Sequence, residues 1–325
     1  MNRIGALDAE AGTVAVQPGV VLNQLNAFLK PHGLFFPPTV STASRATIGG
    51  MVATDASGKG SRIYGKTSDY IEAMDVVLAN GETLSVKTLE PTAFAAVAGQ
   101  ETLAGRIYRE VYRVVTERRD AIRDIFPDMN RGLTGYNLKS VLDVNGHFRL
   151  QYLLAGSEGT LALTKQLTLR VRRLPACRAV VAIRYASFQT ALVDVQRLLA
   201  TDPVAIEILD DKVLSLARGD VLWNDIEDLL GGAGAVPVCG LNVVEFVADS
   251  VEELQTRLDR LLILVADGPK IALDWAVVRD PALIAQLWSL RRNPSACLGG
   301  WALIGREPRS SRTRSAAGEA CRFRG

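Results

Sequence analysis

Residues 37–67, PPTVSTASRATIGGMVATDASGKGSRIYGKT, decide the fold of this chain. The stretch holds five glycines, nine serines or threonines and only a few bulky apolar side chains. Such a composition favours an irregular loop over an ordinary core helix or strand. Glycine lets other groups approach the backbone closely, hydroxyls donate to anionic oxygens, and successive free N–H groups form a nest for a pyrophosphate. Composition also leaves open a long solvated surface loop.

Four further motifs accompany this loop along the chain. They are QPGV at 17–20, ANGE at 79–82, RGLTGYNL at 131–138 and GSEGTL at 156–161. Together with the loop they resemble the FAD-linked oxidases with a vanillyl-alcohol-oxidase-type (PCMH-type) FAD domain, and the resemblance covers residues 1–292. The TDASG form of the loop, with RGLTGYNL, is most similar to the large bacterial D-2-hydroxyglutarate dehydrogenases.

The resemblance implies an α+β fold in two parts. We expect a partial PCMH-type FAD-binding domain over 1–174, without its N-terminal part. A substrate or cap domain over 175–292, without its C-terminal part, would follow, with an antiparallel sheet covered by helices. Residues 293–325 are basic and lack apolar periodicity, so we expect an aberrant, frame-shifted end there, with a disordered tail as the alternative.

Local patterns place the elements. We predict strands over 13–17, 150–154 and 162–171, a helix over 22–29 and helices over 94–126. Asn80-Gly81 predicts a hairpin between strands 73–79 and 83–86. From Ala179 onward strands and helices alternate, which predicts a sheet with helices packed on one face.

The resemblance also implies the chemistry. The family oxidises a D-2-hydroxy acid, here D-2-hydroxyglutarate, D-lactate or glycolate, by hydride transfer to flavin N5 while a base takes the hydroxyl proton. Arg291 matches the arginine that binds the substrate carboxylate, a task suited to a planar guanidinium, although a solvated residue at a helix C-terminus is the alternative. The cofactor-binding residues implied are Pro38, Ser41, Thr42, Thr47, Ile48, Gly49, Gly50, Thr54, Asp55, Ser57, Gly58, Gly156, Glu158 and Gly159.

The sequence supports less specific roles for several other polar residues. Asp55 stands where the family has asparagine, so we expect Lys59 or Lys66 to offset its charge near the flavin. Asn137 and Glu245 are pocket candidates for which a structural role is preferred. We name no catalytic base, because the family's histidine lies beyond the resemblance, while His32 and His147 are interpreted as a helix-end cap and a turn residue.

Two alternatives to an active oxidase remain. GSRIYGKT at 60–67 satisfies the P-loop pattern, but no buried strand precedes it and a strand follows it, so a triphosphatase is disfavoured. The second is a non-catalytic truncated remnant that does not retain FAD, because half of a pyrophosphate site binds weakly.

Composition sets the remaining bounds. The 325 residues allow two cores, and the net charge of +2 is too small to argue for nucleic acid or an anionic membrane. Four widely spaced cysteines form no metal motif and are typical of a reducing cytoplasm. No apolar run approaches the ~20 residues of a membrane span. The partners implied are a small 2-hydroxy acid and an electron acceptor, with an iron–sulfur segment missing from this chain as one candidate.

Overall fold

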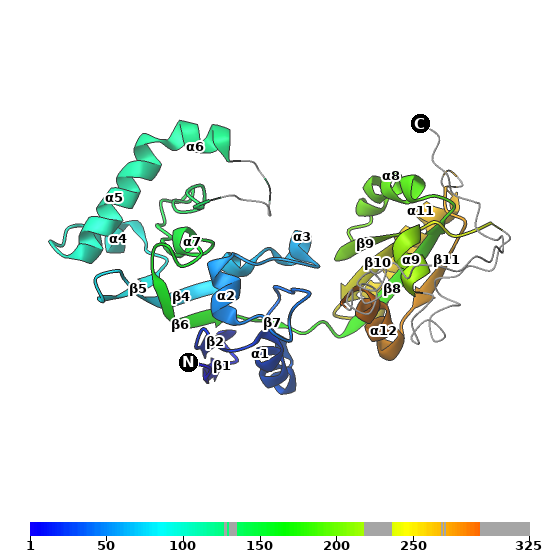
Figure 1. The fold of residues 1–325 in the computed structure, drawn as a ribbon, viewed down its shortest axis with the longest axis horizontal. Helices are drawn as coiled ribbons and strands as arrows, with labels where there is room; N and C mark the ends of the chain where they lie inside the picture. The colour runs from blue at the N-terminus through cyan, green and yellow to red at the C-terminus, as the bar shows by residue number, and fades with distance from the viewer. Residues whose placement is uncertain (127–128, 130–134, 218–235, 268, 270, 293–325) are drawn as a thin grey trace, which may run out of the picture.

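The computed structural model describes residues 1–126, 129, 135–217, 236–267, 269 and 271–292. Two antiparallel sheets form two bodies, joined by the chain that follows β7 (Arg172–Arg173) (Figure 1). The first sheet has the order β1-β2-β6-β4-β5. Its strands are β1 (Ile4–Asp8), β2 (Thr13–Val16), β4 (Ile71–Val77), β5 (Thr83–Lys87) and β6 (Leu163–Arg170).

The N-terminal segment folds as its pattern predicts. Helix α1 (Leu22–Leu29) buries Leu22, Leu25 and Leu29, which share one helical face. The 3₁₀ helix η1 (Lys30–His32) and β3 (Leu34–Phe35) follow, and β3 pairs with β7. The predicted hairpin between β4 and β5 is confirmed, with Gly81 at φ +87° in its turn.

The first body has one hydrophobic core, drawn from residues 14–171. The predicted helical stretch over 94–126 is confirmed as α4 (Pro91–Ala98), α5 (Leu103–Glu117) and α6 (Arg119–Ile125). In Figure 1 α4 and α5 lie at the end of the first body farthest from the second, and α6 runs along the top of this body. The last part of the loop of residues 37–67, where α3 (Ser61–Tyr64) forms, lies on the side of the first body that faces the second.

Two local predictions in this body are wrong. Residues 150–154 were expected to form a strand but fold into α7 (Gln151–Leu154), where the N–H of Leu153 bonds back to the Leu150 carbonyl at 3.0 Å. A short apolar run does not distinguish a strand from a buried helical turn. Residues 37–67 are not wholly irregular, because α2 (Ile48–Ala53) forms within them and buries Ile48, Met51 and Val52.

The second body contains a four-stranded sheet in the order β11-β8-β10-β9. Its strands are β8 (Cys177–Tyr185), β9 (Ala205–Asp210), β10 (Gly240–Ala248) and β11 (Asp274–Val278). Its helices are α8 (Phe188–Leu199), α9 (Asp211–Ala217), α11 (Val251–Asp267) and α12 (Pro281–Arg292). All strand pairs are antiparallel.

Helices cover both faces of this sheet, so the prediction of helices on one face is wrong. Leu198 of α8 and Leu258 of α11 belong to the core on one face, whereas Leu214 of α9 and Leu287 of α12 belong to the core on the other. A strand buried on both faces reads as a continuous apolar run, which explains the sequence AVVAI at 179–183 in β8.

Side-chain caps begin two helices of the second body. Ser250 accepts the N–H of Glu253 through its side chain at 3.1 Å, at the start of α11. Asp280 accepts the N–H of Ala282 at 2.7 Å, immediately before the proline that begins α12. None of the described helices is long and apolar enough to cross a membrane.

Candidate functional site

Helix α2 lies at the centre of the candidate site, because the QPGV motif and the GSEGTL turn both bond to it. The Thr47 side chain caps it by accepting the N–H of Gly50 at 3.2 Å. The N–H of Gly49 donates to the Pro18 carbonyl at 2.7 Å, and a Cβ on Gly49 would lie 2.5 Å from the Cβ of Pro18. Gly49 therefore lets the QPGV motif pack against α2. The N–H groups of Gly49 and Gly50 therefore have acceptors within the protein.

The GSEGTL turn is attached to the other end of α2. The N–H of Gly156 donates to the Val52 carbonyl at 2.9 Å, and the N–H of Glu158 donates to the Ala53 carbonyl at 2.8 Å. Gly159 has φ +77°, and no heavy atom lies within 4 Å of the place that a Cβ would take there. The helix and the turn therefore form one continuous surface that is open at Gly159.

Free backbone donors follow α2 rather than begin it. The N–H groups of Ser57, Gly58 and Lys59 have no backbone acceptor among the described residues. The chain is tightly packed here, since a Cβ on Gly58 would lie 1.8 Å from the Thr39 carbonyl oxygen. Consecutive N–H groups without internal partners can bind an anion.

The exposed groups of this surface can be compared with those that FAD needs. Its polar and glycine positions are exposed at Ser41, Thr42, Gly50, Thr54 and Gly159. Hydroxyl groups and free N–H groups donate hydrogen bonds, and glycines without a side chain allow close approach. An anionic diphosphate needs both properties. The residues present therefore fit the cofactor.

The Asp55 carboxylate is already paired inside the first body. Its Oδ2 lies 2.6 Å from Lys66 Nζ, and its Oδ1 accepts the N–H of Ser68 at 2.8 Å. The Ser68 hydroxyl donates to Oδ2 at 3.1 Å. The expectation that a lysine offsets Asp55 is confirmed for Lys66 and wrong for Lys59, which pairs elsewhere.

The P-loop alternative lacks its structural context. Residues 60–67 run through α3 (Ser61–Tyr64) into η2 (Thr67–Tyr70), and β4 follows. A P-loop instead connects a buried strand to a helix. Lys66 is paired with Asp55, and the Thr67 hydroxyl donates to the Ala56 carbonyl at 2.6 Å. The two residues that would bind phosphate and magnesium therefore stabilise the loop.

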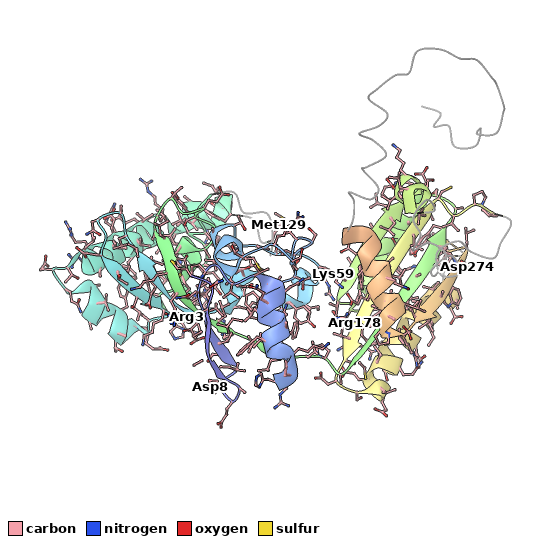
Figure 2. All side chains as sticks on the ribbon, turned by 60° about the horizontal axis from the view of Figure 1, so that its bottom comes forward. Arg3, Asp8, Lys59, Met129, Arg178 and Asp274 are labelled. Carbon is pink, nitrogen blue, oxygen red and sulfur yellow. The ribbon has the colours of Figure 1, made fainter. Side chains whose placement is uncertain are left out.

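A cavity of about 550 Å³ lies between the two bodies. Its volume is within the roughly 300–1,000 Å³ of small-molecule and cofactor sites. Residues of both bodies line it, including Ser41, Ser57, Gly58, Lys59 and Tyr64 from the first and Arg178, Glu245 and Trp288 from the second. Figure 2 labels Lys59 and Arg178 at this junction. The loop thus meets the second body across a space large enough for a ligand.

An ion-pair network forms part of the cavity wall. Lys59 Nζ lies 2.6 Å from Glu245 Oε2, and Arg178 Nε lies 3.2 Å from Glu245 Oε1. Lys59 Nζ also lies 3.7 Å from the centroid of a Trp288 ring, a cation–π contact. Burial lowers the pKa of the Lys59 ammonium, and the Glu245 carboxylate opposes that shift. Trp288 Nε1 is buried without a hydrogen-bond partner among the described residues.

The structure brings most of the predicted cofactor residues into two adjoining groups. Three line the cavity, namely Ser41, Ser57 and Gly58. Others lie on α2 or the turn attached to it, namely Thr47, Ile48, Gly49, Gly50, Thr54, Gly156, Glu158 and Gly159. Pro38 is buried, Thr42 is exposed in the loop, and Asp55 follows α2.

Parts of the predicted site fall outside the described residues. Residues 131–134 of RGLTGYNL and the tail over 293–325 are among them, and so is the side chain of Arg291 in α12. The rest of RGLTGYNL reaches the GSEGTL turn, because the Tyr136 hydroxyl lies 2.9 Å from Thr160 Oγ1. Asn137 is buried and accepts the N–H of Ser140 at 3.1 Å, as expected of a structural residue.

Arg178, Tyr64 and Trp288 were not predicted as cavity residues, and Glu245 was named only as a weaker candidate. One signal was available, because Glu245 is the only charge in the apolar sequence LNVVEFV of β10. Such a charge needs a buried partner. Among the described residues, no cluster of three or more His, Cys, Asp or Glu side chains could hold a metal ion.

Comparison with known proteins identifies the class. Residues 1–87 match the FAD binding domain family, and residues 174–308 match the C-terminal domain of FAD linked oxidases. The two matches include both walls of the cavity. Each body therefore contains a match to a domain family, and the second match is to the FAD-linked oxidases.

Curated relatives narrow this class. The chain is 40% identical to D-2-hydroxyglutarate dehydrogenase of Escherichia coli and 36% identical to that of Pseudomonas putida, each over 92% of the chain and 30% of the relative. It is 28% identical to D-lactate dehydrogenase of Anaerostipes hadrus over 85% of the chain and 50% of that protein. The chain thus spans about a third of the length of the D-2-hydroxyglutarate dehydrogenases that it matches.

A solved structure supports the fold alone. An alkyldihydroxyacetonephosphate synthase superposes with a TM-score of 0.58 at 16% identity, covering 93% of this chain and 46% of that protein. The predicted fold class, a PCMH-type FAD-binding part followed by an antiparallel sheet covered by helices, is confirmed.

Proposed function

We propose that this protein is an FAD-dependent oxidoreductase that oxidises a D-2-hydroxy acid to the 2-oxo acid. The observation that carries the proposal is the 36–40% identity to D-2-hydroxyglutarate dehydrogenases over 92% of the chain. We therefore rank D-2-hydroxyglutarate first among the substrates, ahead of D-lactate and glycolate.

The proposed cofactor contacts follow from the open surface of the first body. FAD, when bound, supplies the acceptor for the hydride from the substrate α-carbon. The chain's own task is to hold it through free N–H groups at Ser57 and Gly58, exposed hydroxyls and open glycines. The exposed members of the proposed set are Ser41, Thr42, Gly50, Thr54, Glu158 and Gly159, with Ser57 and Gly58 beside them. The other members, which we propose shape the loop, α2 and the turn around the cofactor, are Pro38, Thr47, Ile48, Gly49, Asp55 and Gly156.

The proposed substrate contact is Arg291. It follows Trp288 by three residues in the sequence of α12. Trp288 lines the cavity. A guanidinium at that place would bind the substrate carboxylate bidentately.

A retention assay tests the proposal. The 325-residue chain is incubated with FAD and desalted, and its visible absorption spectrum is recorded. We expect a retained flavin spectrum that D-2-hydroxyglutarate bleaches. Gly159→Glu should lower retention at least about tenfold, because it places bulk and negative charge where the surface is open. Gly33→Glu is the matched control, since Gly33 also has positive φ and no atom near its Cβ position, but lies after η1.

The outcomes separate the alternatives. Equal retention by both variants would contradict the proposed surface. A colourless wild-type chain would support the alternative in which this polypeptide does not retain FAD. A retained flavin spectrum that no 2-hydroxy acid bleaches would support the proposed cofactor and contradict the proposed substrate class.

The acceptor and the location are further parts of the proposal. We propose that electrons leave the flavin for a partner outside the described residues, an iron–sulfur segment being the candidate, and that the protein works in the cytoplasm. The four cysteines are widely spaced along the sequence, which supports a reducing compartment.

A further inference from the structure

The segment of residues 59–64 makes polar contacts with the second body. Lys59 bonds to Glu245 of β10, as described above. Arg62 Nη2 lies 2.6 Å from Asp202 Oδ1 and 2.6 Å from the Pro203 carbonyl oxygen. In Figure 1 the helix α3, which lies in this segment, extends from the first body toward the second. The segment begins directly after Ser57 and Gly58, two of the proposed cofactor contacts.

The two ion pairs of this segment differ in burial. The Glu245 side chain is 2% exposed and that of Lys59 is 16% exposed. The Arg62 and Asp202 side chains are 42% and 62% exposed. An exposed ion pair contributes little, whereas separating a buried pair leaves a charge without its partner. Of the two pairs, Lys59–Glu245 is therefore the one in which removing one partner should have the larger effect.

Glycines tighten the segment on both sides of Lys59. A Cβ on Gly58 would lie 1.8 Å from the Thr39 carbonyl oxygen within the first body. Gly60 has φ +81°, and its Cβ would lie 3.2 Å from Val204 Cγ1 in the second body. Lys59 thus lies between one residue packed against the loop and one packed against the second sheet. A displacement of the loop moves the lysine with it.

We propose that Lys59 is a positioning residue that couples the proposed cofactor loop to the placement of the second body. This proposal rests on the proposed function in one respect, which is that the ligand of the loop is FAD. When residues 57–58 are ordered by a ligand, Lys59 is held against Glu245 and Trp288. The second body, with α12, then stays closed over the cavity.

Hydrogen exchange on the 325-residue chain tests the coupling without a cofactor. The variants are Lys59→Met and Glu245→Gln, alone and together, with Arg62→Gln as the matched control from the exposed pair. We expect each single variant to raise exchange about tenfold both in residues 57–64 and in residues 202–210. The double variant should raise exchange less than the single variants, because neither charge is then left buried without its partner. Arg62→Gln should change exchange less than twofold.

Two further measurements complete the test. Lys59→Arg, which keeps the charge, should restore wild-type exchange, and unchanged exchange in β8 shows that each variant is folded. FAD retention should fall in Lys59→Met and stay in Arg62→Gln. Faster exchange in residues 57–64 alone, or additive effects in the double variant, would overturn the coupling. A wild-type chain that retains no FAD would remove the proposed function, and the exchange data would still decide the role of Lys59.

Discussion

At the scale of single residues, Gly58 lies where the loop has no room for even the one methyl group of alanine. Its Cβ position is occupied by the backbone of Thr39, which cannot move aside as a flexible side chain would. We predict that Gly58→Ala destabilises the chain by about 3 kcal/mol, the upper end of overpacking costs. Gly33→Ala is the control, because it meets empty space and costs only the strain of its positive φ, about 1 kcal/mol. Thermal denaturation compares them, and an equal loss at both glycines would contradict the steric argument.

Asp55 supports a second prediction, which concerns charge. Asp55→Asn keeps the shape of the side chain but removes the carboxylate from Lys66, whose side chain is 12% exposed. We expect a loss of about 1–3 kcal/mol, because a largely buried ammonium is left without its partner. Urea denaturation at neutral pH measures it. Asp55→Asn combined with Lys66→Met should recover most of the loss, and a single variant as stable as wild type would refute the role of the pair.

At the scale of elements, His147 attaches a turn to the start of α4. Its Nδ1 lies 3.0 Å from Asp143 Oδ2, and its Nε2 lies 2.9 Å from Glu90 Oε2, on the residue before α4. The hydrogen bond to Asp143 raises the pKa of His147, and Glu90 raises it further. Because the folded pKa is raised, the stabilisation is present below the unfolded value of about 6.5 and is lost as pH rises through the folded value.

The prediction from this turn is a pH-dependent loss. His147→Gln should lower the melting temperature at about pH 6 and change it little at about pH 9, where the wild-type imidazole is neutral. Melting curves across this range measure the difference. The same loss at both values would mean that the imidazolium charge contributes nothing.

Elements whose signals are local were predictable from sequence. The Asn80-Gly81 turn, the apolar face of α1 and the Asp280 cap depend on residues within one or two turns of each other. The helical turn α7 was not predictable, because a short, mostly apolar run fits either a strand or a helix. The Lys59–Glu245 pair joins residues 186 positions apart. Sequence showed a charge in an apolar strand, and only the fold shows its partner.

At the scale of the whole molecule, the cores do not mix. The first core contains only residues 14–171, and the two cores of the second sheet contain only residues from 177 to 288. We therefore propose the boundary at 174/175, with a FAD-binding domain over 1–174 and a substrate domain over 175–292. The cavity and residues 59–64 then lie where the domains meet, which is where a cofactor from one and a substrate from the other would react.

This division predicts that each part folds without the other. Fragments 1–174 and 175–292 should each unfold cooperatively in urea, because neither loses an apolar core residue when the chain is divided. Their summed circular dichroism should match that of residues 1–292. Glu245 gains solvent in the isolated second fragment and keeps Arg178 as a partner, so dividing the chain leaves no buried charge unpaired. If either fragment is unfolded while residues 1–292 are stable, the junction supplies folding energy and the two parts are not independent domains.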